Sequence, residues 1–443
     1  EIQFLRFCYS TMKLVFQVIV LSVFSILPFF LIFEKLRLFE ESKINVGSNY
    51  PINARQLRRK TLNQEDEEDA VSSLSLRTKC INEIRAVHDD KLGSIIRQFN
   101  LDYTPKQDGH WNLLIQPAFQ HNLGDTLLTQ GEQIFYERQA FTYQMCLHRR
   151  AWPAKNISHC PEHFKEARGH NLAFWHAGGN WGDLWEYPMG LRLKGIQPLL
   201  ENNFTLVTMP QSLFYQHDET QEKHAKWIQQ SVADGLGLRA LTPNNMDLPH
   251  SRLVFTWREQ ASYEIAKKLY PFARNMIVPD IAFQMGEFHP TQPRKDLLVD
   301  ILLFLRNDKE STVKNLRNDR AISNILSKVS GENDNDKSVS FRIVDWDDRM
   351  ELFGGDHFNV TNAYELLALG KVVIVDRLHA AILAYLSGLH FIYIDNMYGK
   401  LTKTLTTAIE GREECALWER SSSLENAIQK AMGHLNKQNN NGG

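Results

Sequence analysis

Short apolar runs that alternate with amphipathic stretches are the feature that most limits the folds open to this chain. The predicted strands are WNLLIQ (111–116), LAFWH (172–176), FTLVT (204–208), RLVFTW (252–257), LLVDILLFLR (297–306), FRIVDW (341–346), KVVIV (371–375) and FIYID (391–395). The predicted helices between and after them cover 125–136, 181–191, 221–233, 261–269, 313–329, 363–369, 378–387, 401–408 and 424–435. This alternation indicates βα units and parallel sheets.

The length of the chain argues for more than one core. A chain of 443 residues exceeds what one ordinary domain holds. A proline-containing polar stretch at 289–296 interrupts the alternation. We therefore predict an α/β protein with two Rossmann-like domains, roughly 78–288 and 295–425, that face a cleft. Residues 426–443 are predicted to form a C-terminal helix, which we expect to pack on the first domain, and a disordered tail.

The segment 14–33, LVFQVIVLSVFSILPFFLIF, carries no charged residue. As a helix it would span about 30 Å, the thickness of the hydrocarbon core of a bilayer. We predict a transmembrane signal anchor with residues 1–13 as a cytoplasmic tail. A cleaved signal peptide is the alternative, and a buried soluble helix is a weaker one. Met12, directly before Lys13, is a candidate for the true start.

The residues after this segment are polar and charged as far as 77. They include QEDEEDA (64–70), and we predict a solvated stalk over 34–77 that holds an ordered body away from the membrane. The formal net charge of the chain is −2, and no long run of lysine and arginine occurs in the sequence. We therefore expect no nucleic-acid partner.

Sequons and cysteines indicate that the body faces the lumen of the secretory pathway. The sequons begin at Asn156, Asn203 and Asn359. The cysteines after Met12 are Cys80, Cys146, Cys160 and Cys415. Their even number suits two disulfides, and a Cys146–Cys160 bond would close a short loop. Four cysteines allow three pairings, and four buried thiols are the alternative.

Polar residues stand between a predicted strand and a predicted helix in HNLGDTLLTQG (121–131). Asp125 is a candidate N-cap of the helix, and Gly124 permits a tight turn. Capping alone accounts for both residues. The functional alternative is a turn that includes Asn122 and offers N–H groups to an anion or a sugar hydroxyl.

The stretch FWHAGGNWGDLWEYP (174–188) follows the next predicted strand and repeats the Asn/Gly/Asp grouping. Asp183 is the aspartate of this second grouping. Its adjacent glycines, Gly178 and Gly179, indicate a close approach of the backbone to another group. The tryptophans could stack on the face of a sugar. The alternative is ordinary aromatic core with a structural His176, and for Trp175 we favour the core.

Two arginines follow predicted strands in the two predicted domains. Arg258 follows RLVFTW, at a strand end where a guanidinium can bind a carboxylate or a phosphate with two hydrogen bonds; an ion pair with Glu259 or a nearby acid is the alternative. Asp376, Arg377 and His379 stand where KVVIV passes into a helix. The carboxyl ends of parallel strands bind ligands, and helix N-termini favour anions. These residues predict a site for an anionic ligand.

The ordered set HNLGD, HAGGNWGD, TWRE and VDRLHAAILAYLSG, between about 120 and 395, resembles the polysaccharide pyruvyl transferase family. Where the family often has three glycines, this chain has Ala177, Gly178 and Gly179. The resemblance implies a GT-B-like fold and an enzyme that transfers a pyruvyl group from phosphoenolpyruvate to a sugar as a ketal. The anchor and lumenal body are similar to the eukaryotic Golgi branch, type II membrane glycoproteins that pyruvylate galactose on N-glycans.

The resemblance also implies roles for single residues. The expected donor-binding residues are Arg258, Arg377, Leu378 through its backbone, and His379. Phosphoenolpyruvate carries a carboxylate and a phosphate. Apart from the resemblance, an enzyme that binds it therefore needs at least two separated cationic groups. His379 is also a candidate acid, and Asp125 or Asp183 is a candidate base. The expected acceptor-binding residues are His176, Trp181, Asn180 and Asn122.

We expect neither a cofactor nor a metal, since phosphoenolpyruvate is a substrate and the sequence contains no CxxC motif or His/Cys cluster. Two other functions fit parts of the pattern. A GT-B-type nucleotide-sugar glycosyltransferase would share the anchor and the phosphate-binding helix end, although Asp334-Asn335-Asp336 lies in a polar loop rather than beside a strand. A non-catalytic glycan-binding protein would use the tryptophans but would not need both arginines.

Overall fold

The computed structural model describes residues 64–98, 112–115, 123–146, 171–288, 298–330, 339–346 and 360–441. These residues belong to one compact unit, Asn63–Gly443. The predicted anchor at 14–33 lies outside them, as do Asn122, Asn156, Cys160 and Asn359. Within the described ranges, no helix combines the length and the apolar character needed to cross a membrane.

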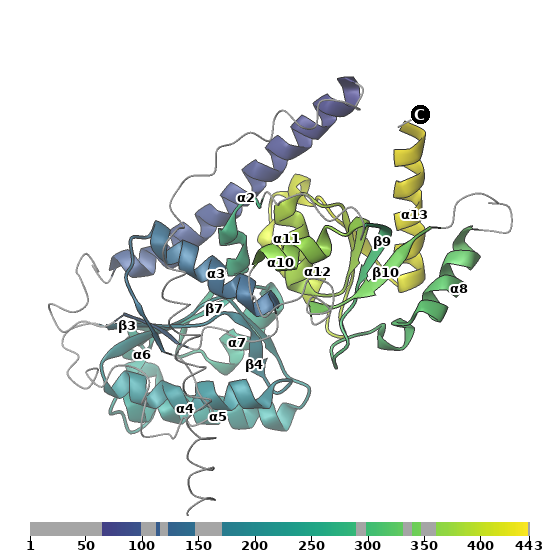
Figure 1. Ribbon diagram of the computed structural model, residues 1–443. Coiled ribbons are helices and arrows are strands. Elements are labelled where there is room, and N and C mark those ends of the chain that lie inside the picture. Colours follow the sequence, from purple (N-terminus) through teal and green to yellow (C-terminus); the bar gives the residue numbers. More distant parts are fainter. Residues whose placement is uncertain are drawn as a thin grey trace, which may run out of the picture. The chain divides into compact units, whose positions relative to one another are not determined.

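The first sheet contains eight strands, and all of its pairings are parallel (Figure 1). The strands are β1 (Asn112–Ile115), β2 (Gln144–Cys146), β3 (Asn171–Trp175), β4 (Gly178–Gly182), β5 (Phe204–Thr208), β6 (Gln211–Phe214), β7 (Leu253–Trp257) and β8 (Arg274–Ile277). Their order is β2-β1-β3-β5-β7-β6-β4, with β8 on β7. β3 pairs with β5, and β4 pairs with β6. β4 therefore continues β3, and β6 continues β5, after a short interruption in each case.

One of these breaks explains a wrong helix prediction. The predicted helix over 181–191 begins only at Glu186, because 178–182 forms β4. A Cβ atom on Gly182 would lie 1.8 Å from the carbonyl oxygen of Phe214, and its φ is 125°. Only glycine allows β4 and β6 to approach this closely.

Helices cover both faces of the first sheet. They are α2 (Gln64–Gln98), α3 (Leu123–Arg138), α4 (Glu186–Glu201), α5 (Asp218–Gly235), α6 (Asp247–Arg252) and α7 (Gln260–Leu269). In Figure 1, α4 and α5 lie side by side below the teal sheet, and α3 lies above it. Helix α2 begins at Gln64, so regular structure starts inside the segment predicted to be a stalk.

The second sheet contains five parallel strands in the order β10-β9-β11-β12-β13. They are β9 (Val299–Phe304), β10 (Phe341–Val344), β11 (Gly370–Val375), β12 (Phe391–Ile394) and β13 (Glu419–Ser421). The helices are α8 (Asp319–Ser330), α10 (Val360–Leu367), α11 (Leu378–Ser387), α12 (Lys400–Ala408) and α13 (Leu424–Asn441). This strand order is that of doubly wound folds. The predicted α/β class with parallel sheets is confirmed.

The last helix packs on the second sheet. Its apolar residues Leu424, Ile428 and Leu435 share a core with Ile392 and Ile374 of β12 and β11. The expectation that it returns to the first domain is therefore wrong. The helix also reaches Asn441, further than the predicted end at 435.

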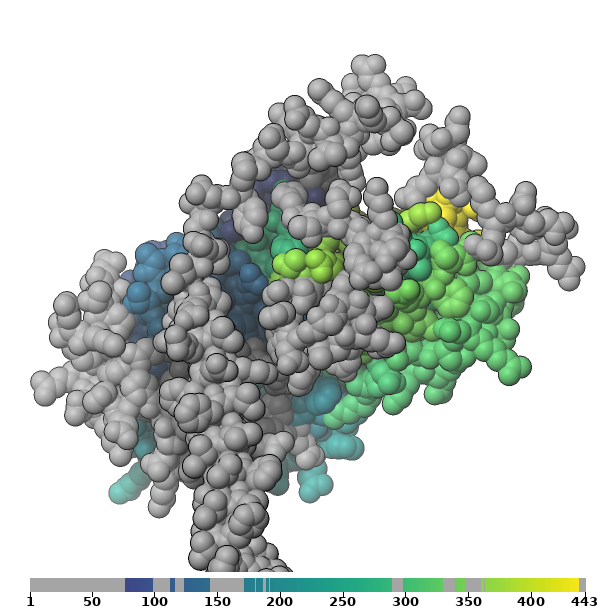
Figure 2. Space-filling model, in the orientation of Figure 1, coloured from purple at the N-terminus to yellow at the C-terminus, as the bar shows by residue number. Residues whose placement is uncertain are grey.

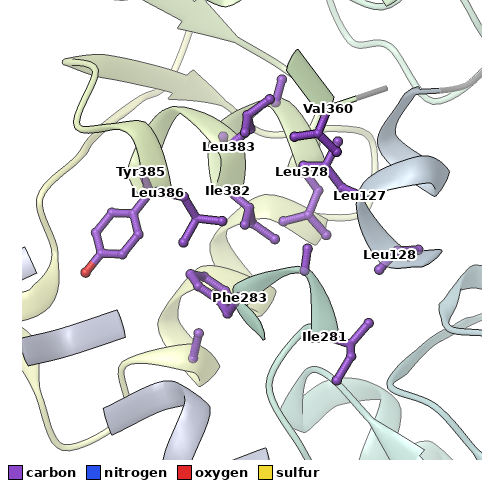
Figure 3. Close-up of a cluster of buried hydrophobic side chains, with 14 of the residues drawn as sticks. Leu127, Leu128, Ile281, Phe283, Val360, Leu378, Ile382, Leu383, Tyr385 and Leu386 are labelled. Carbon is purple, nitrogen blue, oxygen red and sulfur yellow. The ribbon is translucent and has the colours of Figure 1, made fainter. Parts of the chain in front are cut away.

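One apolar core joins the two sheets (Figure 3). Leu127 of α3 and Phe283 of η3 (Ile281–Met285) pack with Leu378 and Ile382 of α11. In Figure 2, blue and teal atoms lie mainly to the left and green atoms mainly to the right. The shared core holds α11 against α3 and η3. The domain boundaries 78–288 and 295–425 stay a prediction.

A disulfide links α2 to the segment between α12 and β13. Cys80 and Cys415 are both fully buried and bonded, with their Cα atoms 5.7 Å apart. The alternative of free thiols is wrong for this pair. The side chain of Cys146 and the whole of Cys160 lie outside the described residues, so the Cys146–Cys160 bond stays a prediction.

Candidate active site

The second sheet places charged residues where its strand order changes direction, between β9 and β11. Ligands bind at such a switch point in doubly wound sheets. Asp376 follows β11 and is fully buried, and its Oδ1 accepts a hydrogen bond of 2.7 Å from the backbone N–H of Arg306 after β9. Burial raises the pKa of Asp376 to about 7, although the Arg306 charge opposes the shift.

Arg377 is the N-cap residue of α11, and its guanidinium pairs with residues of the second sheet's half. Its Nε and Nη2 both donate to the Asp345 carboxylate, the latter at 2.6 Å. Nη2 also lies 3.6 Å from Asp308 Oδ2. Two carboxylates thus already neutralise the arginine that the sequence predicts as a donor ligand.

Arg258 lies where the first sheet meets α11, and it is fully buried. Its Nε donates to Ser212 Oγ at 2.7 Å, and its Nη1 donates to Asp280 Oδ2 at 2.6 Å. Nη1 also lies 3.4 Å from Nε2 of His379. Among the described residues, Nη2 has no hydrogen-bond partner. The sequence predicted that Arg258 and His379 belong to one donor site, and the structure places the two side chains in contact.

Burial and the neighbouring charges set the protonation states of Asp280 and His379. Burial opposes ionisation of Asp280, but the Arg258 guanidinium and His379 hold the pKa of its carboxyl well below the usual value. Burial lowers the pKa of His379, although Asp280 opposes the change. The His379 imidazole is therefore mainly neutral at pH 7, beside a permanent Arg258–Asp280 ion pair.

A second cation, Lys400, approaches the free nitrogen of Arg258 from the start of α12. A Cβ atom on Gly179 would lie 2.6 Å from Lys400 Nζ and 3.2 Å from Arg258 Nη2. Burial lowers the pKa of Lys400, while Glu310, with Oε2 at 3.8 Å from Nζ, opposes the shift. The two cations and the side-chain-free Gly179 make a place suited to an anion.

Glu310 connects this place to both sheets. It is 2% exposed and accepts hydrogen bonds from Arg306 Nη1 (2.7 Å), Asn396 Nδ2 (2.9 Å) and Trp185 Nε1 (3.1 Å). Trp185 belongs to the first sheet's half, whereas Arg306 and Asn396 belong to the second. Glu310 therefore holds the residues around Lys400 in place.

A buried carboxylate also orients His176. Glu132, fully buried in α3, accepts a 2.7 Å hydrogen bond from the Ala177 N–H and lies 2.8 Å from His176 Nδ1. The other ring nitrogen, Nε2, is buried and has no hydrogen-bond partner within the described part of the chain. A histidine held in this way can accept a proton from a substrate hydroxyl.

Asp125 lies near this group. Because α3 begins at Leu123, Asp125 stands in the first turn rather than at the N-cap, so that part of the prediction is wrong. Its negative charge raises the pKa of His379 and of Arg192, against the larger effect of burial on both. Asp125 therefore faces the same region as His379.

Trp181 and Asp183 were predicted to belong to the site, but both make structural contacts instead. Trp181 is 2% exposed, packs in the core with Phe255, and donates from Nε1 to the Tyr270 hydroxyl at 3.2 Å. It presents no free face to a sugar, so the expected acceptor contact of Trp181 is not supported. Trp175 is fully buried, as favoured from the sequence.

The Asp183 carboxylate accepts hydrogen bonds from the backbone N–H groups of Gln216 (2.7 Å) and His217 (2.9 Å), before α5. This fixes a turn and leaves Asp183 poorly placed to act as a base. The side chain of Asn180 lies outside those described. Asn203, exposed and with φ 61°, forms the turn before β5, a conformation that asparagine tolerates.

Sequence reasoning missed four residues of this site: Glu132, Asp280, Glu310 and Lys400. Asp280 and Glu310 follow strands β8 and β9, and Lys400 follows β12, so the strand-end rule could have found them. Glu132 lies inside a helix and carries no local signal.

Residues 248–397 match the family model described as polysaccharide pyruvyl transferase. The chain contains a polysaccharide pyruvyl transferase domain. This domain includes Arg258, Asp280, Glu310 and His379, whereas Lys400 and the residues of α3 lie outside the matched range.

Two relatives extend the similarity beyond the pyruvyl transferase domain. EpsO of Bacillus subtilis (strain 168), named as a candidate pyruvyl transferase, is 24% identical over 350 residues, which cover 74% of this chain and 93% of that protein. Pyruvyl transferase 1 of Schizosaccharomyces pombe (strain 972) is 27% identical over 277 residues, 60% of each chain. A crystal structure of an uncharacterised Klebsiella pneumoniae protein has a TM-score of 0.41 and 18% identity, and it covers 75% of this chain and 98% of its own. The domain and the relatives identify the chain as a transferase.

Proposed function

We propose that this transferase moves the pyruvyl group of phosphoenolpyruvate to two hydroxyls of a terminal sugar, with galactose on a glycan as the acceptor. The observation that carries the proposal is the meeting of Arg258 Nη2, Lys400 Nζ and the bare Gly179 backbone beside the N-terminus of α11. Phosphoenolpyruvate carries two anionic groups, and buried cations with unused donors suit such a ligand.

In this proposal, Arg258 and Lys400 bind one anionic group of the donor. The helix cap residue Arg377 provides no side-chain cap, so the backbone N–H groups of Leu378 and His379 remain available to the other group. Arg377, paired with Asp345, holds the start of α11 in position rather than binding the donor directly. The arrangement corresponds to a GT-B-like donor site between two Rossmann-like domains.

The reaction requires two proton transfers. The donor's methylene carbon gains a proton and becomes a methyl group, while two sugar oxygens bond to the adjacent carbon. The bond from that carbon to the phosphate oxygen breaks, and phosphate leaves with the second hydroxyl proton. We assign His176, oriented by Glu132, to accept a hydroxyl proton, with Asp125 as a second candidate base. His379, beside Arg258, binds the phosphate as a neutral imidazole. The methylene carbon receives the proton that His176 has taken from the first hydroxyl.

We also propose that the body lies in the Golgi lumen, held by a type II anchor at 14–33 and carrying N-glycans. The buried Cys80–Cys415 bond supports an oxidising compartment. The acceptor would then be a secretory glycan, and the membrane would be contacted through the anchor.

The test measures phosphate release from phosphoenolpyruvate by the whole chain with β-galactosides as acceptors. We expect acceptor-dependent release that is lost in Lys400→Met and His379→Ala, while the variants keep the wild-type circular dichroism spectrum. Lys403→Met is the matched control, because Lys403 lies about one turn further along α12 and its Nζ donates to the Tyr398 carbonyl oxygen. Release that does not depend on Lys400 would contradict the donor site. Turnover of a nucleotide sugar instead would indicate a glycosyltransferase.

A further inference from the structure

Three side chains that could ligate a metal meet on the second sheet, far along the chain from one another. They are His390, just before β12, Glu419, the first residue of β13, and His434 in α13. One ligand atom from each lies within 4.8 Å of the other two. His390 Nε2 is 3.7 Å from Glu419 Oε1, which also contacts His434 Nε2.

The geometry of the three groups is close to that of a zinc site. In a tetrahedral site with bonds of about 2.0–2.1 Å, neighbouring ligand atoms lie roughly 3.3 Å apart. The two imidazole rings have centroids 3.9 Å apart. Small side-chain rotations would therefore bring both nitrogens and one carboxylate oxygen to a common ion. All three residues are half-buried, which leaves access for an ion and a water molecule.

His390 supplies an independent sign of a missing partner. Its Nε2 is buried and makes no hydrogen bond to any described residue, since Glu419 Oε1 at 3.7 Å is too far away for one. A buried ring nitrogen without a partner is unfavourable unless another group satisfies it. A metal ion between His390, Glu419 and His434 would do so.

We propose that His390, Glu419 and His434 bind a divalent transition metal of the zinc class. Two imidazoles and one carboxylate favour zinc over the oxygen-preferring calcium and magnesium. His390 precedes β12 and Glu419 begins β13, whereas the proposed donor site follows the ends of strands, and the strands are parallel. The metal site therefore lies at the opposite edge of the sheet. It would fasten α13 to β12 and β13 and take no part in the transfer.

One neighbouring charge opposes this binding. Lys430 of α13 lies with Nζ 3.4 Å from Glu419 Oε2 and donates to the Arg420 carbonyl oxygen at 2.8 Å. Its ammonium group already compensates part of the Glu419 charge and repels a cation. Removal of this charge should strengthen metal binding, an effect that a merely structural cluster would not show.

The experiment titrates zinc chloride into the metal-free whole chain by calorimetry and counts bound zinc by mass spectrometry. We expect one zinc ion per chain and a higher melting temperature with zinc. His390→Ala and His434→Ala should weaken binding by more than about tenfold, the lower end of what even an outer-shell change costs. Lys430→Met should bind zinc more tightly than wild type. His250→Ala, which removes an exposed histidine that contacts the Pro271 carbonyl oxygen, should bind zinc unchanged.

Two results would overturn the proposal. One is the lack of saturable zinc binding to the wild-type chain. The other is equal zinc affinity and equal thermal stabilisation in wild type, His390→Ala and His434→Ala, with all three chains folded when free of metal. Neither result depends on pyruvyl transfer, so the outcome is separate from that of the proposed reaction.

Discussion

Arg258 and His379 come from the two different sheets, yet Arg258 Nη1 lies 3.4 Å from His379 Nε2. The carboxylate of Asp280 holds both, at 2.6 Å from Arg258 and 3.4 Å from His379. The apolar core below them, which includes Leu378, keeps α11 against η3. The polar contacts among Arg258, Asp280 and His379, together with the shared apolar core, therefore hold the two halves of the structure together at the proposed donor site.

Replacement of Arg258 should destabilise the fold through Asp280. Arg258→Met would leave this carboxylate buried without its main partner, and we expect unfolding to need about 3–5 kcal/mol less free energy. The double variant Arg258→Met/Asp280→Asn should recover part of that loss, because no buried charge remains. Urea denaturation measures both. A double variant as unstable as the sum of the two single variants would argue against the ion pair.

Gly179→Ala should weaken donor binding. The added methyl group would enter the space beside Lys400 Nζ and Arg258 Nη2. We expect the KM for phosphoenolpyruvate to rise at least about tenfold, the effect of losing roughly 1.4 kcal/mol. Stability should change little, because the end of the Lys400 side chain can move. Gly190→Ala is the control, since a Cβ atom there meets no atom within 4 Å; equal kinetics in the two variants would contradict the site.

The buried Asp376 should make stability depend on pH. Its pKa is raised to about 7 in the folded chain, mainly by burial. Between about pH 4 and 7 the unfolded chain loses this proton while the folded chain keeps it, so folded stability falls as pH rises through this window. Asp376→Asn removes the effect. Relative to wild type, the variant should gain up to about 4 kcal/mol of unfolding free energy from pH 4 to pH 8, measured by urea denaturation. A constant difference across this range would show that Asp376 ionises normally.

Glu132→Gln should lower the rate of the chemical step. The amide would no longer hold the His176 ring as the carboxylate does. We expect kcat to fall by about 10²-fold or more with little change in the KM for phosphoenolpyruvate. Glu137→Gln, an exposed change in the same helix, should leave both constants unchanged. A rise in KM without loss of kcat would assign Glu132 to binding alone.

Loss of the Cys80–Cys415 disulfide should destabilise the chain. This bond closes a loop with a sequence separation of 335 residues, and both cysteines are fully buried. We expect Cys415→Ser to lower the unfolding free energy by about 2–5 kcal/mol. A reductant should lower the melting temperature of the wild type and have a smaller effect on Cys415→Ser. Equal sensitivity of both chains to the reductant would contradict the bond.

Most regular elements could be predicted from the sequence, because their apolar periodicity is local. FTLVT at 204–208 is β5, and the predicted helix 378–387 is α11. The strands that escaped prediction are short or polar, such as β4 with GGNWG and β13 with ERS. Their conformation comes from pairing with a neighbour rather than from their own residues. The helix α2 starts in a charged segment for which hydrophobic periodicity gave no signal.

The sequence alone determined the parallel α/β class and pointed to Arg258, His176 and His379, because residues at strand ends are brought to one edge of a parallel sheet. Only the tertiary structure decided which charges meet there. It turned Arg377 toward Asp345, placed Lys400 beside Arg258, and set Glu132 behind His176. Spacing along the chain sets the edge of the sheet that a side chain occupies. The packing of one sheet against the other decides which other side chain it contacts there. That packing depends on contacts between residues more than a hundred positions apart.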